Sequence, residues 1–297
     1  MEITIIGLGL IGGSIALDLR RSHFATRLTG VEDNPIHARE AVKRNLVDRI
    51  LNIKEALTDT DIVIIAIPVD KIISLLPYVL SNISKGTTVT DVGSTKLEIA
   101  KAVANHPNRR NYVPSHPMSG TEYSGPMAAK EGLFKQKIAI ICDHKKSAPQ
   151  HLALIEKMYQ TLEMNIAYMS SDEQDHSTAF ISHLPHAVAF ALANTVLAKE
   201  NRSIIFDLAS GGFRSTARLA KSAPSMWGPI FQQNKFYILE AMDTYIKHFI
   251  ELRESIEKNE DEMYKLMTNA NKIKDIVDGK SSSMIKNENR IIKYFTK

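Results

Sequence analysis

The chain has 297 residues, which is enough for one large domain or two medium ones. Hydrophobic residues make up 44% of it and charged residues 24%, and these ordinary globular values exclude disorder as the main state. The formal net charge of +4 is too small to indicate nucleic-acid binding, and it suits an enzyme with an anionic substrate equally well.

Several features of the sequence bear on the cellular compartment of the protein. Cys142 is the only cysteine, so no intrachain disulfide can form, and its place after an apolar run predicts a buried thiol. Met1 and Glu2 carry no basic signal region, and we expect no apolar stretch long enough to span a bilayer. The sequence therefore predicts a cytoplasmic protein that binds neither nucleic acid nor a membrane.

The first half alternates between short runs rich in Ile and Val and segments with helical period. Runs that are apolar at nearly every position are typical of strands buried on both faces of a parallel sheet. Their alternation with helices predicts right-handed crossovers and a doubly wound α/β sheet of the Rossmann type. Strands are expected at 3–6, 28–31, 62–67, 87–90, 138–141 and 165–168, and helices at 11–21, 69–80, 96–105 and 149–161.

After about Ser171 the pattern changes, and we expect the strands to stop. Ser170 followed by acidic residues favours a helix start, and Ser210-Gly211-Gly212 indicates a break between helices. Residues 279–283 loosen the chain before a basic tail, 286–297, which we expect to be a solvated end. Helices are expected at 172–200, 215–221, 224–258 and from 261 onward. We therefore predict a Rossmann domain at 1–171 followed by an all-helical domain at 172–297.

A phosphate-binding loop is indicated where the first strand ends. The motif GLGLIG follows an apolar run and precedes a helical pattern, which is the context that a dinucleotide site requires. In this motif the first glycine permits a tight turn, the second lets the backbone approach a pyrophosphate, and the third lets the helix pack against the strand. The helix start offers free N–H groups to the phosphates. The predicted cofactor residues of the loop are Gly7, Gly9, Leu10, Ile11 and Gly12.

An acid follows the second predicted strand. Glu32 lies 25 residues after Gly7, and a carboxylate there would bind the ribose hydroxyls and repel a 2′-phosphate, which favours NAD over NADP. Ile67 and Pro68 close the next apolar run and are expected to line the cofactor crevice. The alternative is a glycine turn that binds nothing, or binds another nucleotide.

Polar residues at strand ends suggest the chemistry. His116 is the best candidate for the base that takes a hydroxyl proton during hydride transfer, since imidazole titrates near neutral pH. We expect it in a loop after a strand, with Ser94 as a hydrogen-bonding partner that orients it. The alternative is a histidine at the surface of a loop.

A second histidine group lies at the start of the helical half. His183 and His186 are three residues apart, and His176 precedes His183 by one heptad. A metal site is one interpretation, but the pattern lacks a cysteine and a fixed carboxylate, so we predict no metal. We favour substrate binding for at least one of the pair His183 and His186 over a buried core histidine.

Two arginines follow the glycine break. Arg214 and Arg218 are four residues apart, and a guanidinium is the preferred partner of a carboxylate. The alternative is a solvated basic face of a helix.

Taken in chain order, these segments resemble one family. Residues 7–12, 91–96, 116–122, 182–186 and 218–221 are similar to the motifs of the prephenate/arogenate dehydrogenases of tyrosine biosynthesis, over roughly residues 1–250. The resemblance implies a Rossmann domain, a helical dimerisation domain and a homodimer. It also implies oxidative decarboxylation of prephenate to 4-hydroxyphenylpyruvate, with NAD as the oxidant.

The resemblance also implies a role for each matching residue. His116 would be the catalytic histidine at the C4 hydroxyl, and Ser94 the serine that supports it. The implied substrate residues are Glu122 at the pocket mouth, His186, Arg218, and Trp227, which would be contributed across the dimer. From the pattern of the residues we also expect His183 and Arg214 to bind the substrate. Ser215 departs from the pattern, because some members carry there an acid that pairs with the arginine.

Three alternatives stay open. Arogenate differs from prephenate by an amine, and no acid in these motifs is placed to pair with it. A β-hydroxyacid dehydrogenase shares the two-domain plan but usually depends on a catalytic lysine. A non-catalytic NAD sensor would keep the glycine loop without needing His116, Ser94 and Arg218 together.

Overall fold

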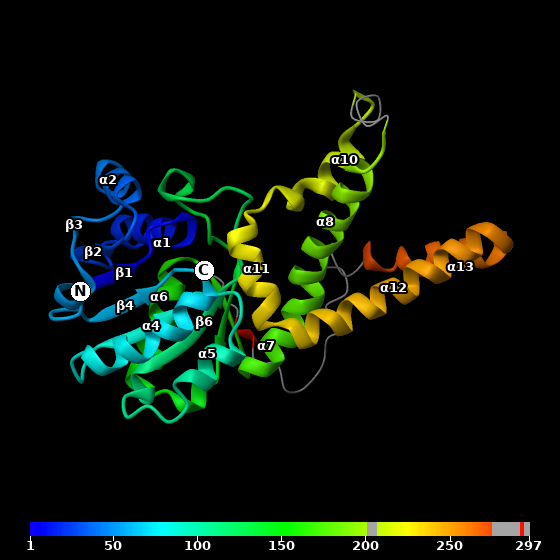
Figure 1. Ribbon diagram of the computed structural model, residues 1–297. Helices are drawn as coiled ribbons and strands as arrows, with labels where there is room; N and C mark the ends of the chain where they lie inside the picture. The colour runs from blue at the N-terminus through cyan, green and yellow to red at the C-terminus, as the bar shows by residue number, and fades with distance from the viewer. Residues whose placement is uncertain (201–206, 275–291, 294–297) are drawn as a thin grey trace.

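The computed structural model describes residues 1–200, 207–274 and 292–293. A sheet with helices on both faces forms one part of the molecule, and a group of helices packs against its edge and extends away from it (Figure 1). This arrangement confirms the predicted fold class, a Rossmann-type sheet followed by a helical domain.

One mixed sheet contains every strand in the described part of the chain, in the order β3-β2-β1-β4-β5-β6-β7-β8-β9. The strands from β3 to β6 are parallel, β7 runs antiparallel to β6 and parallel to β8, and β9 is antiparallel to β8. The bounds are β1 Glu2–Ile6, β2 Arg27–Val31, β3 Arg49–Ile50, β4 Ile62–Ile65, β5 Thr88–Asp91, β6 Tyr112–Pro117, β7 Ile138–Cys142, β8 Asn165–Met169 and β9 Ile292–Lys293.

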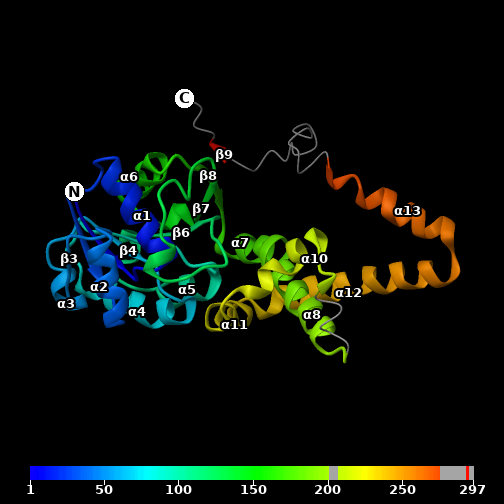
Figure 2. The ribbon, with the colours of Figure 1, turned by 90° about the horizontal axis from the view of Figure 1, so that it is seen from above.

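Helices cover both faces of the sheet. Leu19 of α1 and Ile155 of α6 belong to the apolar core on one face, whereas Ile72 of α4 and Ile99 of α5 belong to the core on the other (Figure 2). The helices of this part are α1 Leu10–Arg21, α2 Pro35–Lys43, α3 Ile53–Ala56, α4 Val69–Asn82, α5 Leu97–Ala102 and α6 Pro149–Thr161, with short 3₁₀ turns at Arg109–Asn111, Pro126–Ala128 and His144–Lys146.

Three strands were missed, and one expectation was wrong. β3 has two residues, too few for a periodic signal. β6 was missed because Pro114 and Pro117 argue against a central strand. The strands do not stop after Ser171, because β9 returns from the C-terminal end of the chain to pair with β8. The expected loosening at 279–283, and the tail at 286–297 apart from β9, lie outside the described residues.

The helical part begins with two helices where one was expected at 172–200. A capping box between Ser170 and Glu173 starts α7, as Ser170 predicted. A π-helical turn over Ala179–His183 then separates α7 from α8. Pro185 lacks an N–H and cannot continue a regular α-helical ladder, and a π-helical turn accommodates such a break. The helices are α7 Ser171–Thr178, α8 Leu184–Leu197, α10 Gly211–Thr216, α11 Pro224–Gln233, α12 Lys235–Lys258 and α13 Glu260–Ala270, with a 3₁₀ turn at Ala217–Lys221.

A second break falls inside the expected helix 224–258. Asn234 ends α11 and starts α12, and its side chain turns away to bond residues of α7 and the π-helical turn. Trp227 and Ile230 of α11 pack into the core beneath α4, which fixes α11 to the sheet domain. The long helix α12 then leads away from the sheet (Figures 1 and 2).

One helical run revises the expectation about membranes. Ser171–Leu197 is long and apolar enough to cross a bilayer by length and composition alone, so the expectation that no stretch qualifies was wrong. Only 11% of its most apolar window is buried within this chain. Asp175 near its start is fixed to the sheet domain, and the run carries His183 and His186, which are features of a domain interface.

A buried carboxylate joins the two parts. Asp175 of α7 accepts hydrogen bonds from the backbone N–H groups of Lys96 (2.7 Å) and Leu97 (2.9 Å), where α5 begins. Asn234 donates to the Asp175 carbonyl oxygen at 2.7 Å. Burial raises the pKa of Asp175 to about 6, although the two N–H groups oppose this shift. The carboxylate therefore holds the helical part against the loop that follows β5.

The raised pKa of Asp175 predicts a pH-dependent stability. Because the folded-state pKa lies above the unfolded value of 3.8, the stability from protonation is fully present below pH 3.8 and is lost as the pH rises through about 6. Relative to Asp175→Asn, the wild-type free energy of unfolding should fall by up to about 3 kcal/mol between pH 4 and 7. Urea unfolding at several pH values measures this. Asp70→Asn, at an exposed carboxylate of α4, is the control, and parallel pH profiles for wild type and Asp175→Asn would contradict the prediction.

Candidate active site

The glycine loop lies where the strand order of the sheet reverses, between β1 and β4. Gly7 has a φ of +92°, and a Cβ there would lie 2.5 Å from the Ala66 carbonyl oxygen, so both its conformation and its space require glycine. A Cβ on Gly12 would lie 2.0 Å from the Gly7 carbonyl oxygen, which explains the close packing of α1 on the turn. A Cβ on Gly9 would meet nothing within 4 Å.

This loop fits a dinucleotide. Gly9 is the N-cap of α1 and has no side chain to cap the helix, so the N–H groups at the start of α1 have no side-chain cap. Leu10 and Ile11 form the first turn of that helix. Open space over Gly9 beside uncapped N–H groups is what a pyrophosphate needs. Ile67 and the exposed Pro68 follow β4 on the opposite side of the switch point.

Glu32 stands at the end of β2 and closes the loop from that side. Its carboxylate accepts hydrogen bonds from the N–H of Leu8 (3.0 Å) and the N–H of Asn34 (3.1 Å). His37 lies 3.9 Å away. The side chain is 13% exposed, so one edge of the carboxylate remains accessible for ribose hydroxyls.

His116 lies in β6, not in a loop, and its side chain is buried, so the surface-loop alternative is wrong. The expectation that His116 titrates near neutral pH is also wrong. Burial, and then the charges of Lys96 and His183, lower the pKa of His116 to about 3. The ring is therefore neutral at physiological pH and able to accept a proton.

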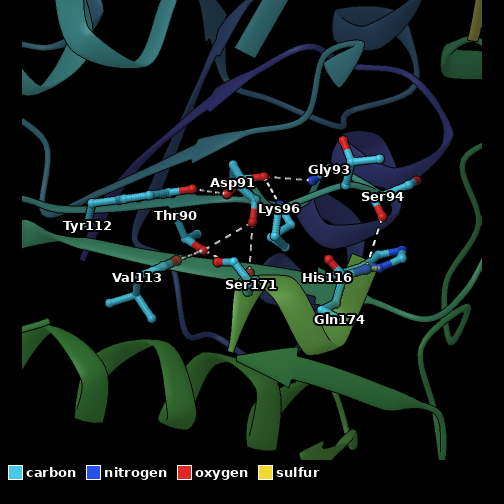
Figure 3. Close-up of polar contacts among 12 residues, drawn as sticks. Thr90, Asp91, Gly93, Ser94, Lys96, Tyr112, Val113, His116, Ser171 and Gln174 are labelled. Carbon is cyan, nitrogen blue, oxygen red and sulfur yellow. Dashed lines mark hydrogen bonds and ion pairs between the residues drawn. The ribbon is translucent and has the colours of Figure 1, made fainter. Parts of the chain in front are cut away.

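Gln174 of α7 holds the His116 ring (Figure 3). Its Nε2 lies 3.3 Å from His116 Nδ1, and it donates to the Ser94 carbonyl oxygen and to Thr178 Oγ1, both at 3.1 Å. Because the two amide hydrogens have two closer acceptors, this contact positions the ring without fixing which ring nitrogen is protonated. Ser94 thus meets the same amide through its backbone, and the predicted support of His116 by the Ser94 side chain stays a prediction.

A buried ion pair lies beneath these residues. Lys96 and Asp91 are both fully buried and bonded to each other, and Asp91 also accepts from the N–H of Gly93 (2.9 Å) and the hydroxyl of Tyr112 (2.5 Å; Figure 3). Every strong partner of the Asp91 carboxylate is therefore a fixed donor. The Lys96 charge is one of the causes that keep His116 neutral.

The three histidines of the helical part differ in burial and in partners at the junction between the sheet domain and the helical domain. His183 is fully buried and its Nδ1 lies 3.0 Å from Asn234 Nδ2. His186 stacks on Trp227 with ring centroids 3.5 Å apart, and its Nδ1 lies 2.9 Å from the Ser182 carbonyl oxygen. His176 is exposed and lies 3.8 Å from Glu240, away from the pair. Trp227 reaches His186 within its own chain, whereas the resemblance implied a contribution across the dimer.

An ion pair bridges the two parts at the rim. Arg218 Nη1 lies 3.3 Å from Glu122 Oε2, and Glu122 belongs to the segment after β6. Ser215, where some family members carry an acid, donates to the Gly212 carbonyl oxygen instead. Glu122 therefore supplies the carboxylate partner of Arg218. Arg214 is exposed on α10, and the contacts found among the described residues do not include its side chain.

Several site residues were missed from the sequence. Asp91 and Lys96 lie in a segment that resembles a family motif, but nothing in the sequence indicates that they pair. Gln174, Asp175 and Asn234 carried no motif signal. The only available clue was their polarity on helices that otherwise needed apolar faces.

A glycine loop at the switch point, with a buried neutral histidine at the same edge of the sheet, defines the class of two-domain dinucleotide-dependent dehydrogenases. The family model of the prephenate dehydrogenase nucleotide-binding domain matches residues 15–168, and that of the prephenate dehydrogenase dimerization domain matches residues 170–279. The chain belongs to the prephenate dehydrogenase family.

Individual relatives agree with this placement. The prephenate dehydrogenase of Bacillus subtilis is 35% identical over 88% of this chain and 71% of its own length. A crystal structure of prephenate dehydrogenase from A. aeolicus, in complex with hydroxyphenyl propionate and NAD+, is 31% identical, has a TM-score of 0.85, and covers 94% of this chain and 98% of its own. Synechocystis arogenate dehydrogenase is 28% identical with a TM-score of 0.76, and covers 93% of this chain and 100% of its own.

The glycine loop yields a matched pair of variants. Gly12→Ala should lower the melting temperature by several degrees and weaken NAD binding, because its Cβ meets the Gly7 carbonyl. Gly9→Ala should leave the melting temperature unchanged yet weaken NAD binding by about tenfold or more, because its methyl group fills the space over the loop. Thermal unfolding and titration with NAD measure both. Unchanged NAD affinity in Gly9→Ala would contradict a pyrophosphate at this loop.

Proposed function

We propose that this protein is an NAD-dependent prephenate dehydrogenase that converts prephenate to 4-hydroxyphenylpyruvate. The observation that carries this proposal is the place of His116. It is a buried, neutral imidazole on the carboxyl edge of the sheet that also carries the glycine loop, and Gln174 of the helical part holds it. We propose that the loop residues, Glu32, Ile67 and Pro68 hold NAD, which supplies the hydride acceptor when it is bound.

The chemistry needs little beyond positioning and one base. Removal of hydride from C4 and of the hydroxyl proton by His116 leaves a dienone, and loss of the ring carboxylate as CO2 makes the ring aromatic. Because aromatisation drives the departure of CO2, no acid or metal is needed for decarboxylation. A buried imidazole with a low pKa is deprotonated before substrate binds, and the negative charge of a dianionic substrate would raise that pKa towards the useful range.

Groups of the helical part suit an anionic substrate. Four residues border the same junction as His116, namely Arg218, His183, His186 and Trp227. We propose that they bind the substrate together with Glu122 at the rim. Four buried polar atoms there have no hydrogen-bond partner among the described residues, namely Gln174 Oε1, His183 Nε2, Trp227 Nε1 and Gln233 Nε2. Both Trp227 Nε1 and Gln233 Nε2 are donors, which matches a ligand rich in acceptor oxygens.

Arogenate is the second candidate substrate, because one solved relative is named arogenate dehydrogenase. Incubation with NAD and either prephenate or arogenate, followed by absorbance of the reduced nicotinamide, separates the two. We expect prephenate to be preferred, because the Glu122 carboxylate at the rim pairs with Arg218 among the described residues and is not placed as a dedicated partner for an amine. Turnover of neither compound would refute the proposal.

A homodimer through the helical part is also proposed. α8 is apolar along its length yet buries only Ala189 within this chain, and α12 exposes Phe236, Leu239, Ile246 and Phe249. Exposed apolar side chains gathered on two helices are typical of an interface, and the match to the dimerization-domain model favours a second copy as their cover. A single buried cysteine and an intracellular cofactor favour the cytoplasm.

His116→Asn tests the catalytic base. The variant should bind NAD with nearly unchanged affinity while kcat falls by about two to four orders of magnitude, the usual contribution of a general base. Steady-state kinetics and NAD titration measure the two effects. Near-normal turnover would remove His116 from this role.

Arg218→Ala tests the substrate arginine. Loss of a guanidinium that binds the substrate should raise KM for prephenate more than it lowers kcat. Arg214→Ala is the matched comparison, four residues away in sequence, and a smaller change in KM is expected because the Arg214 side chain is exposed and pairs with no carboxylate among the described residues. An unchanged KM in Arg218→Ala would exclude it from substrate binding.

A further inference from the structure

The most informative unexplained group is His183, the last residue of the π-helical turn. Its side chain is fully buried, it lies edge-on to Trp227 with ring centroids 5.9 Å apart, and its charge would influence His116. Its Nδ1 faces Asn234, while its Nε2 is buried without a hydrogen-bond partner among the described residues. A buried ring nitrogen of this kind requires an explanation.

The hydrogen bonds of Asn234 determine where the proton of His183 lies. Asn234 Nδ2 contacts the Asp175 carbonyl oxygen at 2.7 Å, and a carbonyl can only accept, so the amide nitrogen must face it. The second hydrogen of the same nitrogen faces His183 Nδ1 at 3.0 Å. His183 Nδ1 must therefore present a lone pair, and the proton of a neutral ring is confined to Nε2. Gln174 places no such constraint on His116, because it has a third contact.

We propose that Asn234 is a positioning residue that fixes His183 as a neutral Nε2–H donor, and that this donor binds an acceptor oxygen of the substrate at the junction of the two domains. The second half of this proposal rests on the proposed function, because it assumes an oxygen-rich substrate there. The first half, the tautomer, depends only on the hydrogen bonds of Asn234.

The neutral state of the His183 ring matters for the base, His116. Burial, together with the neighbouring His186, lowers the pKa of His183 to about 4, so the ring stays uncharged at physiological pH. A cationic ring would disfavour protonation of His116, which already has Lys96 nearby. A neutral donor can bind a substrate oxygen without adding that penalty, so the base remains able to take its proton.

The tautomer is tested by NMR on the full-length protein labelled with ¹⁵N-histidine. The chain has ten histidines, and disappearance of one pair of ring signals in His183→Gln assigns His183. We expect a protonated Nε2 and a bare Nδ1 throughout pH 6–8. In Asn234→Asp the carboxylate would accept from Nδ1, so the proton should move to Nδ1 or the ring should become doubly protonated. A wild-type ring protonated on Nδ1 would overturn the proposal.

Two further variants test the bond to the substrate. A glutamine amide reaches about as far as Nε2 and restores a donor there, whereas an asparagine amide reaches only as far as Nδ1. His183→Gln should keep KM for prephenate within about threefold of wild type, and His183→Asn should raise it by about tenfold, the effect of one lost buried hydrogen bond. Thermal unfolding of both variants checks that they fold. Equal KM values in the two folded variants would overturn substrate binding by Nε2.

The outcomes separate the two proposals. Hydroxyphenyl propionate, the ligand of the A. aeolicus structure, serves as a probe that does not turn over. If wild type neither oxidises prephenate nor binds this probe, the proposed function fails while the NMR result still decides the tautomer. If wild type turns over normally but the NMR shows the other tautomer, only the role of Asn234 fails.

Discussion

The carboxylate of Asp175 is the contact on which the rest of the site depends. It projects from the first helix of the second domain and receives two backbone N–H groups where α5 begins, within the segment that carries Ser94 and Lys96. The residue before it, Gln174, reaches His116, and Asn234 bonds the Asp175 carbonyl. One turn of helix thus sets the distance between the base on the sheet and the histidines of the helical part.

The charges and pKa values at this junction are determined by the burial of its side chains. The Lys96–Asp91 pair has no exposed surface, and a buried pair of this kind is tolerated only when its members keep all their partners, which Asp91 does through Gly93 and Tyr112. Burial, and then the nearby charges of Lys96 and His183, hold the His116 imidazole neutral. A dianionic substrate would add negative charge near His116, so its binding would raise the basicity of the base.

Local patterns could predict the parts of the fold that obey one period. The parallel strands β1, β2, β4 and β5 were found because they are buried on both faces, and the glycine loop because its context was complete. β6 was missed although it carries the base, since Pro114 and Pro117 mask it. Gln174, Asp175 and Asn234 could not be found from the sequence, because their roles arise from contacts between residues 51 to 80 positions apart. Tertiary proximity of this kind leaves no trace in a single sequence.

The breaks in the helices have a common logic. Pro185 forces a π-helical turn before α8, and this turn contains His183; Asn234 interrupts what the sequence suggested was one helix, and its side chain is thereby free to reach that same histidine. In a regular helix through either point, these polar side chains would lie on the surface of the helix and could not reach one another. Departures from regular secondary structure at functional sites are common, since strained or wide turns aim side chains that a regular helix cannot. The two irregularities that sequence periodicity failed to predict are therefore the ones that bring a donor, its positioning amide and the base to one junction.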